Sequence, residues 1–156
     1  MKVRLLTVNK TDKGWVKEGA DEFVARLKKY LQFEMKDLEI SRTAAKSKQK
    51  SLEEESAKIL GQLKPGDYLV LLDEKGKQFT SVGFSVWLNK KFVGINGDLV
   101  FVVGGPFGFG ESVRARADEI ISLSEMTFTH QMVRVFFIEQ LYRAMTILKN
   151  EPYHHE

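Results

Sequence analysis

Short apolar runs alternate along this chain with longer stretches in which apolar residues recur every three or four positions. The short runs predict β-strands at residues 3–8, 33–40, 68–72, 99–103 and 120–123. The longer stretches predict helices at about residues 15–31, 51–63, 81–92, 111–119 and 130–149. Strands that alternate with helices are typical of an α/β fold, in which helices cover both faces of a parallel sheet.

Local signals set the expected ends of these elements. Ser51 and Glu54 form an S-x-x-E pair, which predicts a capping box at the start of the second helix. Residues 73–77, DEKGK, have the composition of a turn, so the third strand is expected to end before them. Within residues 33–40 the apolar positions change sides, which predicts either a bulge or a strand buried on both sides. The apolar face of the first helix is expected to begin at Trp15.

Residues 99–110, LVFVVGGPFGFG, change abruptly from an apolar run to four glycines and a proline. The run is typical of a strand buried on both faces of a parallel sheet. Ligands of open α/β sheets bind outside the carboxyl ends of the strands, so this glycine-rich exit is a candidate binding site. The alternative is a tight turn without a ligand. The glycines match neither G-x-G-x-x-G nor a P-loop, so a phosphate cradle is not favoured.

Residues 122–143, SLSEMTFTHQMVRVFFIEQLYR, lead from the fifth strand into the last helix. Apolar side chains here, with the backbone groups beside them, favour either one wall of a cofactor pocket or plain packing at the joint between strand and helix. Glu139 and Arg143 have the spacing of a helix-supporting ion pair, and Arg134 is an unusual charge among apolar neighbours. Because the last helix is apolar nearly all round, we expect a second subunit to cover it in a homodimer.

The 156 residues fit one domain, residues 1–156. The absence of cysteine excludes disulfides and thiolate chemistry. His130 stands alone and His154 and His155 are adjacent in the tail, so the histidines predict no metal site. Charges interrupt the apolar amino terminus and no apolar stretch is long enough to span a membrane, so we expect a soluble, cytoplasmic protein with no membrane partner. The net charge of +3 is compatible with an anionic partner. Residues 41–51, SRTAAKSKQKS, carry four cations and no acid, and are either a mobile solvated connector or an arm that contacts phosphates.

Five segments together carry a family resemblance. They are LD at residues 72–73, GGPFG at 104–108, LSEMTFTHQMVR at 123–134, EQLYRAMTI at 139–147 and NEPYHHE at 150–156. In this order and over the whole chain, they resemble the ribosomal RNA large subunit methyltransferase H family of the SPOUT superfamily. The family's tail commonly ends in Tyr-His and a basic residue, whereas His155 stands at the basic position here.

The resemblance implies a carboxyl-terminal trefoil knot in the α/β fold and a homodimer that binds S-adenosylmethionine in the knot. It also implies methylation at N3 of a pseudouridine in 23S rRNA of the assembled ribosome. The residues that match the family's cofactor contacts are Leu72, Gly104, Leu123, Ser124, Glu125, Met126, Thr127 and Phe128.

The N3 proton of the target must leave during methyl transfer, and a group that titrates near neutrality suits this task. We therefore expect His154, near the mouth of the pocket, to take part in catalysis. Arg134, Arg143 and His155 are expected to contact RNA, or for the two arginines the dimer partner. Alternative functions are a non-catalytic ribosome-binding or assembly factor and, more remotely, a nucleotide-binding regulatory module.

Overall fold

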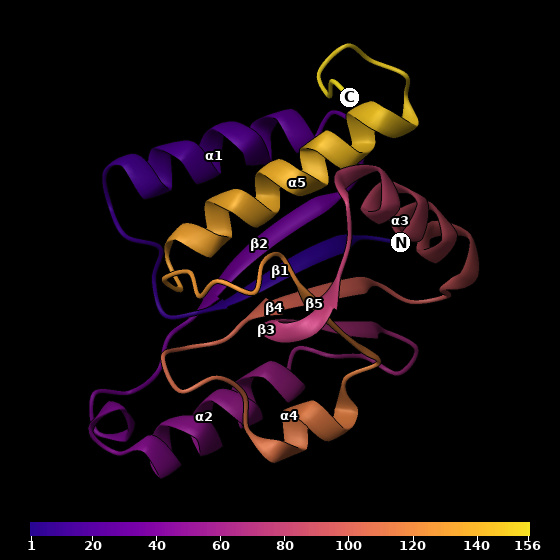
Figure 1. Cartoon of the computed structure of the whole chain (residues 1–156). Helices are drawn as coiled ribbons and strands as arrows, with labels where there is room; N and C mark the ends of the chain where they lie inside the picture. The colour runs from indigo at the N-terminus through magenta and orange to yellow at the C-terminus, as the bar shows by residue number, and fades with distance from the viewer.

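Five parallel strands form the centre of the fold in the computed structural model, which describes residues 1–156 (Figure 1). The strands are β1 (Val3–Val8), β2 (Phe33–Leu38), β3 (Tyr68–Gln78), β4 (Leu99–Val103) and β5 (Glu119–Ser122). Their order in the sheet is β2-β1-β4-β3-β5, and every neighbouring pair is parallel. The predicted parallel α/β sheet is confirmed.

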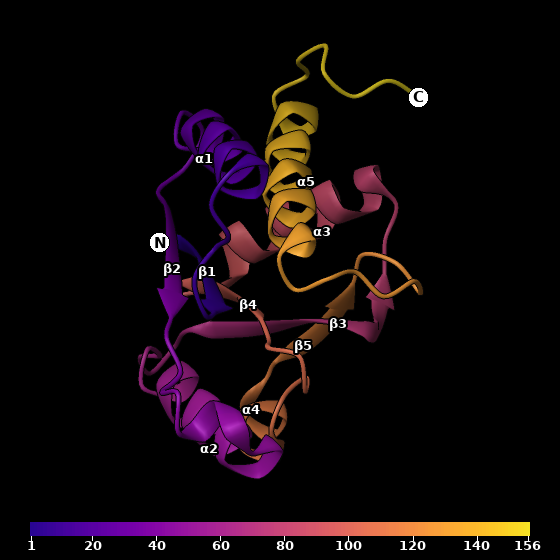
Figure 2. The same cartoon turned by 90° about the vertical axis from the view of Figure 1, so that its left-hand side faces the viewer.

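Helices cover both faces of this sheet (Figures 1 and 2). On one face lie α1 (Trp15–Leu27), α3 (Ser81–Gly94) and α5 (Met132–Leu148), and on the other lie α2 (Lys48–Leu60) and α4 (Glu111–Arg116). Neighbouring residues of a strand point to opposite faces, so β4 contributes Phe101 to one apolar cluster and Val102 to the other. Both residues are completely buried, which explains why the sequence of β4 is a continuous apolar run.

The start of α2 differs from the prediction. Ser47, not Ser51, is its N-cap, and the Ser47 hydroxyl accepts a hydrogen bond from the backbone N–H of Lys50. Ser51 is buried inside the helix, and Glu54 accepts hydrogen bonds from the backbone and the hydroxyl of Ser41. The predicted capping box is therefore wrong, because the serine one turn earlier competes successfully for the helix start. Residues 41–51 are not a loop throughout, since they form a 3-10 turn, Ala44–Lys46, and the first turn of α2.

Strand β3 also departs from the prediction, because it continues through residues 73–77 where a turn was expected. After an irregularity between Leu72 and Lys77, the strand pairs again with Ile121 and Ser122 of β5. Gly76 makes this possible, since a Cβ there would lie 2.6 Å from the backbone carbon of Ile121. Pairing with a strand that comes 40 residues later thus overrides a local turn composition.

The remaining differences concern element ends. Helix α1 ends at Leu27 rather than 31, and α4 ends at Arg116 rather than 119. Trp15 is 65% exposed, so the apolar face of α1 begins at Val16 instead. Strand β2 pairs with β1 without interruption and is buried at both ends, which supports the two-sided strand over the bulge. None of the helices combines the length and the apolar character needed to cross a membrane.

Candidate functional site

A cavity of about 530 Å³ opens at the edge where the central strands end. Three chain segments surround it: residues 72–75 at the irregularity within β3, the glycine loop after β4, and the segment that leads from β5 to α5. The structure brings seven of the eight predicted cofactor contacts into its lining, namely Leu72, Gly104, Leu123, Ser124, Met126, Thr127 and Phe128. Glu125 is exposed and is not part of the lining.

The glycine loop is a tight turn that also forms one wall of the cavity. Gly108 has a φ of +74°, and its N–H donates to the carbonyl of Gly105 at 3.1 Å. A Cβ on Gly104 would lie 3.0 Å from the Gly108 carbonyl oxygen, and one on Gly105 would lie 2.6 Å from Oε1 of Glu55. The loop is therefore both the tight turn and the wall of a candidate binding site that the glycines suggested, and it packs closely against α2.

Local hydrogen bonds shape the segment between β5 and α5. The Ser122 hydroxyl donates to the carbonyl of Ser124, whose own hydroxyl accepts from the backbone N–H of Met126 at 3.0 Å. The Thr127 hydroxyl donates a hydrogen bond to the carboxylate of Glu74, which lies within the irregular part of β3. Phe128 packs on Phe136 of α5, with ring centroids 5.2 Å apart. The segment thus presents both apolar side chains and backbone polar groups to the cavity.

Charges of both signs also line the cavity. Arg114 of α4 donates a hydrogen bond of 2.8 Å to Asp73, and both residues line the cavity. Burial alone would raise the pKa of Asp73, but hydrogen bonds from the backbone of Lys75 and from Arg114 outweigh it and lower the pKa. The cavity therefore suits a ligand with apolar and polar parts. Nowhere do three or more His, Asp or Glu side chains gather closely enough to hold a metal ion.

His130 lines the cavity and carries a buried ring atom, Nδ1, that has no hydrogen-bond partner. Burial, assisted by the nearby charge of Arg134, lowers the pKa of His130, so the imidazole is neutral at neutral pH. An unpaired buried polar atom costs about 1–3 kcal/mol, which a ligand that bonds to it would recover. His130 was not among the predicted site residues, although it stands within the segment that carries the family resemblance.

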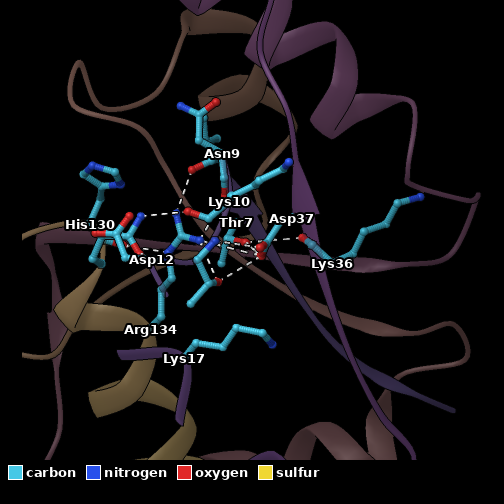
Figure 3. A network of polar contacts seen from close by, with 12 residues as sticks. Thr7, Asn9, Lys10, Asp12, Lys17, Lys36, Asp37, His130 and Arg134 are labelled. Carbon is cyan, nitrogen blue, oxygen red and sulfur yellow. Dashed lines mark hydrogen bonds and ion pairs between the residues drawn. The ribbon is translucent and has the colours of Figure 1, made fainter. Parts of the chain in front are cut away.

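Arg134, which was expected at an RNA or subunit contact, is instead completely buried (Figure 3). Its guanidinium donates four hydrogen bonds of 2.7–3.0 Å, to the carbonyls of Val8, Asn9 and His130 and to the hydroxyl of Thr11. Asp37 of β2 lies 3.6 Å away and adds an opposite charge. The prediction for Arg134 is wrong, because its side chain ties the end of β1 to the start of α5 and presents no atom to solvent.

The predicted tail residues lie far from the cavity in the same chain. Arg143 forms the predicted ion pair with Glu139 at 2.6 Å and lies 3.2 Å from Nδ1 of His154. The cavity is at the start of α5, whereas Arg143 lies eleven residues, or about 17 Å of helix, beyond Met132 (Figure 1). Within one chain, His154 therefore does not line the cavity, and its place at the mouth of a pocket stays a prediction. His155 is exposed in the tail beyond it.

The fold and the site define an α/β protein that binds a small ligand where its parallel strands end, without a phosphate loop. The sequence model of a family described as "Predicted SPOUT methyltransferase" matches residues 1–154. Relatives called "Ribosomal RNA large subunit methyltransferase H" are 55% identical in Parabacteroides distasonis, over 159 residues, and 46% identical in Porphyromonas gingivalis, over 157 residues. Each comparison covers 100% of both chains. The chain therefore belongs to the ribosomal RNA large subunit methyltransferase H family of SPOUT methyltransferases, which confirms the resemblance.

Among solved structures, the chain is similar to the SpoU methyltransferase AviRb from Streptomyces viridochromogenes, which was crystallised in complex with AdoMet. The two share 12% sequence identity with a TM-score of 0.47, over 96% of this chain and 59% of AviRb.

Proposed function

We propose that this protein transfers a methyl group from S-adenosylmethionine to N3 of a pseudouridine in 23S rRNA of the assembled ribosome. One observation carries the proposal. The residues that match the family's cofactor contacts come from segments as far apart as Leu72 and Phe128, yet they line one cavity. This chain also matches relatives named as ribosomal RNA methyltransferases over their full length.

The cavity fits S-adenosylmethionine in size and in chemistry. Its volume of about 530 Å³ falls within the usual range for cofactor sites. When bound, the cofactor supplies a methyl group on a positively charged sulfur. Leu72, Gly104 and the segment 123–128 would hold it through apolar side chains and backbone groups, and the unpaired Nδ1 of His130 offers a further polar contact.

The predicted role of His154 requires a second copy of the chain, because its own cavity is at the other end of α5. A homodimer, part of this proposal, would allow the tail of one subunit to reach the cavity of its partner. An apolar hollow of about 320 Å³ supports such a dimer, since it is lined by phenylalanines that include Phe128 and the 42% exposed Phe136. Phe136→Glu is expected to yield a folded monomer in analytical ultracentrifugation, whereas an unchanged mass would refute this interface.

Arg143 of α5 and His155 of the tail remain proposed RNA contacts, with Arg143 also packed on the ring of Tyr153.

The proposed single domain of residues 1–156 includes the trefoil knot. Its support is that the chain leaves β5 at one edge of the sheet and returns so that α5 packs between α1 and α3. When the chain is pulled from both termini in a single-molecule experiment, a knot would tighten and hold residues out of the stretched length. The final end-to-end distance of a knotted chain should therefore be less than roughly 3.5 Å times the number of residues.

Two measurements test the activity. Calorimetry is expected to detect binding of S-adenosylmethionine and none of other nucleotides, which separates the enzyme from a nucleotide-binding regulator. Purified ribosomes incubated with labelled cofactor should then acquire methyl groups in 23S rRNA only when that rRNA contains pseudouridine. Cofactor binding without methyl incorporation would refute the enzyme and favour a ribosome-binding or assembly factor.

A further inference from the structure

The side chains Arg42, Lys46, Lys48 and Lys50, here called the cation platform, form an exposed group of positive charges. None of them has an acidic partner within ion-pair distance, whereas all six other arginines and five of the 14 other lysines do. The neighbouring acids of α2 are engaged elsewhere. Glu53 accepts from Gln49, Glu54 binds Ser41 and Lys58, and Glu55 is buried.

The backbone that carries these cations is ordered. Glu54 holds the hydroxyl of Ser41 at 2.7 Å, Ala44 is buried, and Ser47 caps α2. Residues 44–50 form a 3-10 turn and the first turn of α2, so the backbone positions of Lys46, Lys48 and Lys50 are set before any partner binds. Pre-organised charges lose less conformational entropy on binding than charges on a mobile arm.

The position of the charges is unfavourable for the free protein. The amino terminus of a helix carries partial positive charge and favours acidic side chains, each by about 0.3–1 kcal/mol. The first turn of α2 contains no acid and carries Lys48 and Lys50 instead. A local conflict of this kind, with no compensating contact in the chain, indicates a function for the charges.

Helix α2, whose first turn carries Lys48 and Lys50, packs against the glycine loop that lines the cavity. A Cβ on Gly110 would lie 2.5 Å from the Ser56 hydroxyl and 3.6 Å from the Leu52 carbonyl oxygen, so α2 runs directly beneath the loop. Lys48 is one helical turn, about 5–6 Å, before Leu52. Figure 1 shows the start of α2 at the same side of the molecule as the glycine loop and the start of α5.

We infer that the cation platform binds the phosphate backbone of RNA next to the nucleotide that enters the cavity. This inference rests on the proposed function, which supplies an RNA substrate. Cations that contact phosphates bind without reading sequence, and they set the register of the RNA on the protein. The platform thus docks the substrate, while the cavity holds the cofactor.

The test compares two variants with equal loss of charge. K48Q/K50Q removes two platform cations, and K28Q/K29Q removes two exposed lysines at the end of α1, at the opposite edge of the sheet. Binding to a 23S rRNA fragment is measured by fluorescence anisotropy between 50 and 200 mM KCl. The association constant K falls with salt, and each lost phosphate contact makes the slope d log K/d log [salt] shallower by about 0.7–0.9. K48Q/K50Q should therefore reduce the magnitude of this slope by about 1.5. K28Q/K29Q should leave it within 0.3 of wild type, on the order of the experimental error.

Stability and kinetics complete the comparison. Removal of the unfavourable charges should raise the melting temperature of K48Q/K50Q by about 1–3 °C. Its KM for ribosomes should rise by about tenfold, with kcat and the affinity for S-adenosylmethionine unchanged. K28Q/K29Q should show neither effect. Equal salt dependence in the two variants would overturn the inference, and so would a loss of cofactor affinity in K48Q/K50Q.

The inference and the proposed function fail in different ways. If wild-type protein does not methylate ribosomes but K48Q/K50Q still lowers the salt dependence of RNA binding, the enzyme is refuted and the platform stands. If wild type methylates ribosomes and K48Q/K50Q binds RNA as wild type does, the platform is refuted and the enzyme stands.

Discussion

Replacement of Arg134 by methionine should destabilise the protein severely without acting on RNA directly. The substitution keeps a long flexible side chain but removes a guanidinium that is completely buried. Three backbone carbonyls and the Thr11 hydroxyl then lose their donor, and Asp37 loses its neighbouring cation. Arg134→Lys retains the charge on a single nitrogen, which cannot reach acceptors on both sides of the planar guanidinium.

The magnitude follows from these contacts. Breaking a buried charged network by removing one partner costs about 3–5 kcal/mol. We expect about 4 kcal/mol for Arg134→Met and about 2–3 kcal/mol for Arg134→Lys, because one or two of the four hydrogen bonds can re-form. For a chain of this length, 1 kcal/mol corresponds to about 2–4 °C, so Arg134→Met should lower the melting temperature by about 8–16 °C.

Urea unfolding followed by circular dichroism measures the free energy, and calorimetry measures cofactor affinity in the folded fraction. Arg26→Met is the control, because Arg26 forms an exposed ion pair with Glu22 and lies over the rings of Phe23 and Tyr142, so its removal should cost much less stability than removal of Arg134. A loss below about 1 kcal/mol for Arg134→Met would contradict the structural role, since it is less than one charged hydrogen bond is worth. If Arg134→Met has normal stability but binds RNA more weakly, the prediction that Arg134 contacts RNA would be supported after all.

Three further predictions concern the cavity and its support. His130→Leu removes the unpaired Nδ1, so the urea midpoint should not fall, while calorimetry should show about tenfold weaker binding of S-adenosylmethionine, the worth of one hydrogen bond. Gly104→Val would bring a Cβ within 3.0 Å of the Gly108 carbonyl oxygen, so cofactor binding should be lost while the circular dichroism spectrum remains that of a folded protein. Burial raises the pKa of Glu55 despite a hydrogen bond from Ser51, so the folded state binds a proton more tightly than the unfolded state, and stability falls as pH rises through the interval between the two pKa values. Glu55→Gln should therefore be more stable than wild type in urea at pH 7, and the difference should disappear below the ordinary carboxyl pKa; a difference that is equal at both pH values would refute this.

The sequence predicted the elements that local patterning controls. The run of residues 99–103 is apolar because both faces of β4 are buried, and this could be recognised before the neighbours of the strand were known. The cofactor-site residues came from the family resemblance, and they line one cavity because parallel strands end at a common edge. Glu139 and Arg143 form their ion pair because helical spacing alone brings them together.

Contacts between distant segments decided the rest. The end of β3 depends on β5, since Ile121 pairs with Leu72 and again with Lys77, so the strand resumes after residues 73–76 have left the ladder. The sequence does not reveal whether Arg134 and His130 face solvent or the interior. The packing of α5 against the end of β1 buries Arg134 in a hydrogen-bond network and places His130 in the lining of the cavity. His154 was assigned to the pocket because a sequence carries no distances, whereas the length of α5 separates the two in this chain. The sequence by itself thus determined the strands, the helices and the family, because these follow from local periodicity and composition. The tertiary structure decided which polar groups meet, because burial and distance arise only when the chain has folded.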